Sequence, residues 1–307
     1  MKVISSAGDL HPGSRRVCVA IGVFDGVHLG HQQVIQQTVS DAHQHDALAV
    51  VVTFDGHPAT VLAPEQAPRM IYPLSRKLRL IGGLGADATV LFHFDRAFSQ
   101  QSGEAFIRAL ARDFGQVFSV CVGSNFTFGH QRTGNLALLK KLGQELKFVA
   151  HGHAAVSLGG KSISSTRIRE AIHTGHLEGA SQMLGRSYSL IGTVVRGDHL
   201  GRELGFPTAN LDTTNLALPP NGVYAVNALV QQQCRSAVLN IGYRPTLDSP
   251  QPRLQVETHL LDFQGDLYGA ELEIVFLGKL REEHKFSSRE ALQAQIARDI
   301  AAARALR

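Results

Sequence analysis

The stretch VCVAIGVFDGVHLGH at residues 17–31 carries the first indication of the fold. It begins with the apolar run Val17–Phe24, which predicts a short buried strand, and it leads directly into a segment of helical period, Gly30–His45. Similar apolar runs return along the first half of the chain, each followed by a segment that can form a helix. We predict further strands over Leu48–Phe54, Thr89–Phe94 and Val117–Val122.

Helical segments follow these strands at Ser75–Leu84, Ser102–Phe114 and Asn135–Leu142. Alternation of short strands with helices is typical of a parallel sheet covered by helices on both faces. Short all-apolar runs such as Ala47–Val52 are what a sheet buried on both faces requires. We therefore predict an α/β domain over residues 1–184.

The pattern changes near residue 185, after a helical stretch over Arg167–Leu184. Turn clusters rich in Gly, Pro, Asn and Asp then separate short strands, which is typical of an antiparallel barrel or sandwich. A last helix is predicted from Ser288 to about Ala303, because Ser287 and Ser288 are good cap residues. The second domain is therefore predicted over residues 185–307, with strands at Ser187–Val195, Gly222–Val230, Ser236–Ile241, Leu254–Asp262 and Glu271–Leu280.

The composition excludes several classes of protein. With 307 residues, 44% of them apolar and 18% charged, the chain suits two globular domains, and no apolar run approaches the roughly 18 residues of a membrane helix. The N-terminus does not resemble a secretory signal, so we expect a cytoplasmic protein. A net charge of +4, dispersed basic residues and no Trp favour a small anionic ligand over nucleic acid. Cys18, Cys121 and Cys234 lie in apolar stretches without metal-binding spacing, so we expect all three in the core.

Three glycines and two histidines mark the turn between the first strand and its helix. Gly22, Gly26 and Gly30 permit positive φ angles and let the backbone approach a phosphate closely. His28 and His31 are three residues apart at a helix start, so both rings can face an anion held by the free N–H groups there. These residues alone leave two alternatives open: a tight turn with solvent-facing histidines, and a zinc site without an evident third ligand.

A second segment of similar chemistry, SISSTRIR, occupies residues 162–169. It places hydroxyl groups at a helix cap and two arginines, Arg167 and Arg169, in the first turns. Arginine at a helix start opposes the helix dipole, so these side chains are better explained as an anion clamp. The two segments together favour a phosphate site.

These segments carry a resemblance to a known family. GxFDGxHxGH followed by ISSTRIR resembles the FMN adenylyltransferase module of bacterial bifunctional riboflavin kinase/FAD synthetases, and GSNFTFG at residues 123–129 is similar to an element between them. The resemblance implies a Rossmann-like α/β nucleotidyltransferase fold and in-line attack of the FMN phosphate on the α-phosphorus of ATP. It implies ATP phosphate contacts from His28 and His31, a cradle completed by Ser165, Thr166 and Arg169, Asn125 beside the nucleotide or flavin, and further nucleotide contacts from Gly22, Phe24, Asp25, Gly26 and Gly30.

Two positions depart from the family pattern. The family usually reads TFEPHP after its second strand, whereas this chain has TFDGHP at residues 53–58. Asn125 stands where Asp is common. The first departure changes the loop at Asp55 and Gly56, and the second keeps a carbonyl acceptor.

A glycine-rich string, GTVVRGDHLGRELGFPTANL, opens the β-rich half at residues 192–211. Gly197, Gly201 and Gly205 are spaced by four residues and could form a backbone-rich flap over phosphates. Thr208 and Asn210 lie two residues apart in an extended segment, so their oxygens share one face and suit Mg²⁺. A local Asx or ST turn is the alternative for PTAN taken alone.

The full GRxLGFPTAN string resembles the riboflavin kinase signature of the same enzymes, and the resemblance then extends over essentially the whole chain. It implies a six-stranded antiparallel barrel, for which Phe206–Leu211 is the candidate sixth strand. It also implies that Thr208 and Asn210 contact Mg²⁺ and ATP, that Gly197, Gly201 and Arg202 contact the nucleotide, and that Glu257 accepts the proton of the riboflavin 5′-hydroxyl. Further matching segments are Pro219–Tyr224, Asn240–Thr246, Val256–Phe263 and Gly265–Gly269.

Strand alternation places Glu257 on the more polar face of its strand, where a solvated carboxylate is the alternative to a catalytic base. Glu271 and Glu273 are rival carboxylates, but they alternate with apolar residues as expected of an outward polar face. We predict that Arg281–Phe286 is a solvated turn, although in the family this region borders the flavin.

The leading hypothesis is one chain with two activities: ATP and riboflavin give FMN, and ATP and FMN give FAD. The partners are then riboflavin, FMN, ATP and Mg²⁺, without nucleic acid or membrane, and the chain is a monomer or weak homo-oligomer. Two rival hypotheses are a chain with only one active module and a flavin or nucleotide sensor that regulates a partner or an RNA. The intact His28, His31, Arg169, Thr208, Asn210 and Glu257 argue against both.

Overall fold

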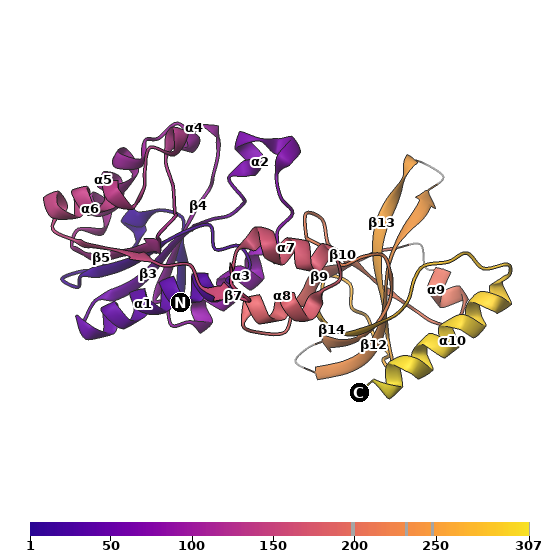
Figure 1. Cartoon of the computed structure of the whole chain (residues 1–307). Helices are drawn as coiled ribbons and strands as arrows, with labels where there is room; N and C mark the ends of the chain where they lie inside the picture. The colour runs from indigo at the N-terminus through magenta and orange to yellow at the C-terminus, as the bar shows by residue number, and fades with distance from the viewer. Residues whose placement is uncertain (198–199, 231–232, 247–248, 307) are drawn as a thin grey trace. The chain divides into compact units, whose positions relative to one another are not determined.

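The computed structural model describes residues 1–197, 200–230, 233–246 and 249–306. The chain forms two compact units (Figure 1). The first contains Met1–Ile168 and Met183–Gly185, and the second contains Arg169–Gln182 and Arg186–Arg307. Among the described residues, no helix combines the length and the apolar character needed to cross a membrane.

The first unit is built on a six-stranded parallel sheet with the order β1-β4-β3-β2-β5-β6. The four predicted strands are confirmed, and two edge strands were not predicted. The first of these has only three residues and the other, VAHGH, alternates with polar residues, so neither shows a continuous apolar run. The strands are β1 Lys2–Ile4, β2 Val17–Ile21, β3 Leu48–Phe54, β4 Ala88–Phe92, β5 Val117–Gly123 and β6 Val149–His153.

Helices cover both faces of this sheet, as the alternation of apolar runs and helical segments predicts. Val17, Val19 and Ile21 on one face of β2 pack in a cluster with side chains of α5 (Gly103–Phe114) and α6 (Leu136–Leu146). Ala20 on the other face packs with side chains of α1 (Leu29–Gln44) and α3 (Leu74–Gly83). The remaining elements of the unit are short: α2 Ala59–Leu62, α4 Arg96–Ser99, β7 Ser157–Leu158, β8 Lys161–Ser162 and three 3₁₀ turns at Ala7–Asp9, Pro64–Gln66 and His130–Arg132.

The strand order places β2 at the topological switch point of the sheet. The chain moves from β2 to β3 and β4 on one side and then returns to add β5 and β6 on the other side. Ligands of open α/β sheets bind at the carboxyl ends of strands beside such a point. The turn that carries His28 follows β2, so the fold puts it where a ligand is expected.

The second unit is a closed antiparallel barrel with the strand order β10-β13-β12-β11-β14-β9. The candidate sixth strand is present as β10, which joins β9 to β13 and closes the barrel. The terminal helix α10 packs on β11 and β12, with Ala303 in a cluster with Val223 and Val238. The elements are β9 Ser189–Val195, α9 Leu200–Glu203, β10 Ala209–Asp212, β11 Gly222–Val230, β12 Gln233–Thr246, β13 Ser249–Leu260, β14 Glu271–Arg281 and α10 Arg289–Ala305.

Two details differ from the predictions. The helical stretch predicted over Arg167–Leu184 is two helices, α7 Ser165–His173 and α8 Leu177–Leu184, because Gly175 adopts a φ of 78° between them. Cys18 and Cys121 are buried as expected, but Cys234 is exposed. Cys234 lies near the start of the long strand β12, between the polar residues Gln233 and Arg235.

Candidate active sites

The turn after β2 is held in an unusual backbone conformation. Phe24 and Val27 have φ angles of 52° and 41°, a region that residues with side chains rarely adopt and that is most unfavourable for a β-branched one. Of the three predicted glycines only Gly26 has a positive φ, 79°. Gly22 instead allows the Phe24 ring to pack closely against the backbone, since a Cβ at position 22 would lie 2.9 Å from that ring. Strained residues of this kind cluster at ligand sites, where the surrounding structure sustains them.

His28 and His31 form one stacked unit at the start of α1. His28 is the N-cap, and its Nδ1 accepts a hydrogen bond of 3.3 Å from the His31 N–H. The neutral His28 ring therefore carries its proton on Nε2. The two imidazole centroids lie 3.6 Å apart with an interplanar angle of 17°, and Gly30 leaves room for the pair, because a Cβ there would meet His28 at 3.3 Å. His28 is only 6% exposed, so the alternative of solvent-facing histidines is wrong for it.

The His31 ring is neutral at physiological pH. Its burial, together with His28 and Lys77 nearby, holds its pKa well below the usual value. His31 Nδ1 is buried and has no hydrogen-bond partner within the part of the chain that the structure describes. A buried polar atom without a partner is costly, and such atoms are a feature of binding sites. The pair can donate N–H groups to an anion without itself carrying positive charge.

The ISSTRIR segment is joined directly to the first motif. The Ser165 hydroxyl donates a hydrogen bond of 2.9 Å to the backbone carbonyl of Asp25, 140 positions away in the sequence. Asp25 is 2% exposed, and its carboxylate accepts a hydrogen bond of 3.0 Å from the Ile71 N–H. The structure therefore brings the two predicted phosphate segments together, with Asp25 as the residue that anchors them.

The two arginines of this segment have different surroundings. Arg167 donates hydrogen bonds to the carbonyls of Leu158, Lys161 and Ser162, so it fastens the β7–β8 hairpin. Its role in an anion clamp stays a prediction. Arg169 is buried and lies in the second unit, while Thr166 is exposed on α7.

The unusual TFDGHP loop keeps a defined shape. Asp55 accepts from His93 at 2.6 Å and from the Phe94 N–H at 3.4 Å, which ties the loop to the end of β4. Partial burial alone would raise the pKa of Asp55, but the hydrogen bonds from His93 and the backbone outweigh it and lower the pKa. Asn125 is exposed in the loop after β5, followed by the stacked rings of Phe126 and Phe128.

The barrel brings the predicted kinase residues together from separate strands. Asn210 on β10 pairs in register with Glu257 on β13, and Glu257 pairs on its other side with Asn240 on β12. Glu257, Asn240 and Thr208 line one cavity of about 230 Å³. The apolar part of its wall consists of Leu204, Phe206, Val223, Val238, Phe286, Leu292 and Ile296. The sequence places Asn240 only within a matching segment, Asn240–Thr246. Its position beside the predicted base Glu257 follows from strand pairing.

Two glycines of the predicted flap allow close packing against the predicted metal residues. A Cβ on Gly197 would overlap the Asn210 side chain, and one on Gly201 would lie 2.5 Å from the Phe206 carbonyl and 3.0 Å from Thr208 Oγ1. Gly205 has a φ of 87° in the turn that follows α9. Arg202 is exposed on α9, and the motif residues Asp198 and His199 lie outside the described residues.

Gly201→Ala is expected to lower the rate of ATP-dependent phosphorylation by about tenfold, because the new methyl group must displace the Phe206 carbonyl or Thr208. Gly179→Ala is the control, since nothing lies within 4 Å of a Cβ at that position. Steady-state rates of both variants check this. Unchanged phosphorylation by the Gly201 variant would show that the flap tolerates the displacement.

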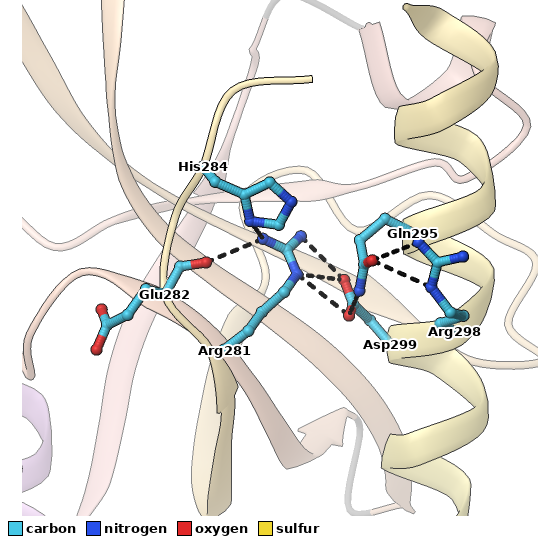
Figure 2. Close-up of polar contacts among 6 residues, drawn as sticks. All are labelled: Arg281, Glu282, His284, Gln295, Arg298 and Asp299. Carbon is cyan, nitrogen blue, oxygen red and sulfur yellow. Dashed lines mark hydrogen bonds and ion pairs between the residues drawn. The ribbon is translucent and has the colours of Figure 1, made fainter. Parts of the chain in front are cut away.

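Arg281 and Asp299 line the cavity and belong to an ion-pair network, whose contacts Figure 2 shows. Arg281 at the end of β14 donates from Nε at 3.0 Å and 3.2 Å to both carboxylate oxygens of Asp299 on α10. Their side chains are 18% and 6% exposed. Gln295 donates to Asp299 at 2.8 Å and accepts from Arg298 at 2.6 Å. The prediction of a solvated turn is therefore wrong for Arg281, because this residue pairs with Asp299, 18 positions later in the sequence. Glu282 is exposed, as predicted.

The donor set of the barrel site suits a metal ion held partly by substrate. Thr208 and Asn210 offer neutral oxygens, which fit Mg²⁺ that keeps water and phosphate ligands. Within the described residues there is no group of three or more His, Cys, Asp or Glu side chains that could hold a metal ion. This observation also gives no support to the zinc alternative for His28 and His31.

Comparison with known proteins agrees with this division into two sites. Residues 11–167 match the family model described as FAD synthetase, and residues 184–307 match the one described as riboflavin kinase. The chain is 38% identical over 306 residues to the bifunctional riboflavin kinase/FMN adenylyltransferase of Escherichia coli (strain K12), covering 99% of this chain and 97% of that protein. The chain belongs to the bifunctional riboflavin kinase/FMN adenylyltransferase family.

Other similar proteins extend this result. The bifunctional riboflavin kinase/FMN adenylyltransferase of Pseudomonas fluorescens is 36% identical over 306 residues, covering 100% of this chain and 98% of that protein. The crystal structure of a macrolide-efflux protein from Streptococcus pneumoniae superposes with a TM-score of 0.81 at 28% identity, covering 98% of both chains. In this chain, the FAD synthetase match contains His28, His31 and Ser165, and the riboflavin kinase match contains Thr208 and Glu257.

Proposed function

We propose that this chain makes FMN from riboflavin and ATP in residues 185–307 and makes FAD from FMN and ATP in residues 1–184. The observation that carries the proposal is the convergence of Glu257, Asn240 and Thr208 on one partly apolar cavity. A flavin ring needs an apolar wall, and its 5′-hydroxyl needs a base. Family membership supports both reactions on one chain.

In the proposed kinase reaction, the riboflavin 5′-oxygen attacks the γ-phosphorus of ATP and ADP leaves. Glu257 accepts the hydroxyl proton on a carboxylate oxygen, which a base within hydrogen-bond reach can do at neutral pH. Thr208 and Asn210 would hold Mg²⁺, which neutralises charge on the ATP phosphates. Gly197, Gly201 and Arg202 lie in the segment assigned to the nucleotide.

In the proposed adenylyl transfer, an FMN phosphate oxygen attacks the α-phosphorus of ATP and pyrophosphate leaves, so no covalent enzyme intermediate forms. His28 and His31 donate N–H groups to the phosphates, and the strained turn of Gly22, Phe24 and Gly26 supplies backbone close to them. Aligning two anions in this way accounts for much of the rate, since positioning can supply about 7 to 11 kcal/mol. The roles of Thr166, Arg169 and Asn125 stay predictions.

Separating flavins by chromatography tests the proposal. Purified protein is incubated with ATP, Mg²⁺ and either riboflavin or FMN. FAD in both reactions is expected. FMN from riboflavin with unchanged FMN in the second tube would contradict the adenylyltransferase assignment, and no turnover in either would contradict both. Size-exclusion chromatography of the same sample tests the expected monomer or weak homo-oligomer, and cell fractionation tests the proposed cytoplasmic location.

Asp299→Ala is expected to destabilise the second unit by about 3 kcal/mol, because it leaves the nearly buried Arg281 guanidinium without its partner. It should also raise the KM for riboflavin, since Arg281 and Asp299 line the cavity. Arg304 lies on the same helix as Asp299 and forms an exposed pair with Asp262 in the turn after β13, so Arg304→Ala should cost far less stability. Chemical denaturation and kinase kinetics measure both effects, and equal losses in the two variants would contradict the prediction.

A further inference from the structure

Lys77 is a buried lysine that the proposed mechanism does not use. It lies on α3, and only 2% of its surface is exposed. Its ammonium group donates to the Phe54 carbonyl at 2.6 Å, to the Val23 carbonyl at 3.4 Å and to the Thr53 hydroxyl at 3.4 Å. An ammonium group has three protons, so these three acceptors account for all of them.

The acceptors belong to the two strand ends that frame the proposed adenylyl-transfer site. Val23 begins the strained turn after β2 that leads to His28 and His31. Thr53 and Phe54 end β3 and begin the TFDGHP loop. Thr53 Oγ1 also donates to the Val23 carbonyl at 3.0 Å, so Lys77 completes a small network beneath both turns.

A charged group at this position is costly and needs an explanation. Methionine would fill a similar space without the penalty of removing an ammonium group from water. The first and largest effect on Lys77 is burial, which lowers its pKa to about 8 even though Asp25 and Asp55 act in the opposite direction. The positive charge of Lys77 also helps to lower the pKa of His31, so Lys77 acts electrostatically on a residue predicted to contact the phosphates.

We propose that Lys77 is a positioning residue for adenylyl transfer, whose ammonium group holds the ends of β2 and β3 together so that His28 and His31 stay aligned with the phosphates. The inference rests on the proposed function of the first unit. Lys77 does not itself contact the reacting atoms in this assignment. It acts through the Val23 carbonyl on one turn and through Thr53 and Phe54 on the other.

The positioning role of Lys77 depends on its protonation state. Loss of the Lys77 proton leaves an amine with two protons, so one of the three hydrogen bonds is lost. The titratable groups that face Lys77 are Asp25, Asp55 and His31, and none of these residue types has an ordinary pKa near 8. Adenylyl transfer should therefore decline as the pH rises through about 8, while riboflavin phosphorylation on the same chain should not share that decline.

Three variants of the full chain test the proposal: Lys77→Met, Lys77→Arg and, as a control, Lys140→Met, an exposed lysine on α6. Lys77→Met should lower kcat for FAD formation by about 100-fold with a much smaller change in the KM for FMN, because a misplaced site loses alignment more than binding. Lys77→Arg should keep most of the activity and lose the decline above about pH 8, since arginine stays charged. Lys140→Met should leave both reactions unchanged.

Two results would overturn the proposal. One is a folded Lys77→Met protein, judged by circular dichroism and thermal unfolding, that makes FAD within about threefold of the wild-type rate. The other is a Lys77→Arg protein whose rate of FAD formation still declines above about pH 8, as in the wild type. This second result tests the proposal even if the Lys77→Met protein does not fold. If wild-type protein makes no FAD from FMN at all, the proposed function of the first unit fails rather than the role of Lys77.

Discussion

Glu257→Gln is expected to lower FMN formation from riboflavin by a factor of about 1,000 while FAD formation from supplied FMN continues. Glutamine has nearly the same shape and keeps the strand register with Asn210 and Asn240, so the barrel should fold. What it lacks is a carboxylate that can accept the proton of the attacking hydroxyl. The riboflavin must then react through its neutral hydroxyl group, which is a much weaker nucleophile.

The rival carboxylate supplies the control for this experiment. Glu271→Gln changes an exposed residue at the start of β14 and should leave both rates unchanged. Both rates are measured on the same preparation, so FAD formation from FMN reports intact protein. A Glu257→Gln protein that still phosphorylates riboflavin at a near wild-type rate would remove Glu257 from the role of base.

His31→Ala should have the opposite effect: FAD formation falls by a factor of about 100 to 1,000, and riboflavin phosphorylation remains. The substitution removes an imidazole whose low pKa keeps it neutral and whose Nδ1 has no partner among the described residues. It also removes the ring that stacks on His28 at 3.6 Å, so the remaining donor loses that packing contact. The His28 cap survives, because it uses the backbone N–H of residue 31.

His43→Ala is the matched control, since His43 is exposed near the other end of the same helix. FAD and pyrophosphate release from FMN and ATP are measured beside the kinase rate. Equal loss of both activities in a folded His31→Ala protein would mean that the two reactions are strongly coupled rather than held in separate sites. Full retention of FAD formation would mean that the stacked pair does not contact the phosphates.

Much of the fold follows from local patterns. Largely apolar runs such as Leu48–Phe54 become central parallel strands, and the turn residues of the second half separate the strands of a barrel. These features depend on periodicity and on backbone preferences within a few residues, so sequence alone reveals them. The short edge strands β1 and β6 escape prediction because a strand of three residues or one with alternating polar residues has no such pattern.

Local patterns also identify the segments proposed to carry the chemistry, because the spacing of glycine, histidine and hydroxyl residues at a strand end or helix start is local. The residues that those segments contact depend on the tertiary fold. The order of the strands in the sheet brings Lys77 into contact with two turns that are some 30 residues apart. Strand pairing in the barrel places Asn240 beside Glu257. The terminal helix supplies Asp299 as the ion-pair partner of Arg281. In the same way, Arg167 donates hydrogen bonds to the β7–β8 hairpin, which its local sequence does not predict. A side chain's partner depends on which distant segments the strand order makes neighbours, and no local pattern contains that information.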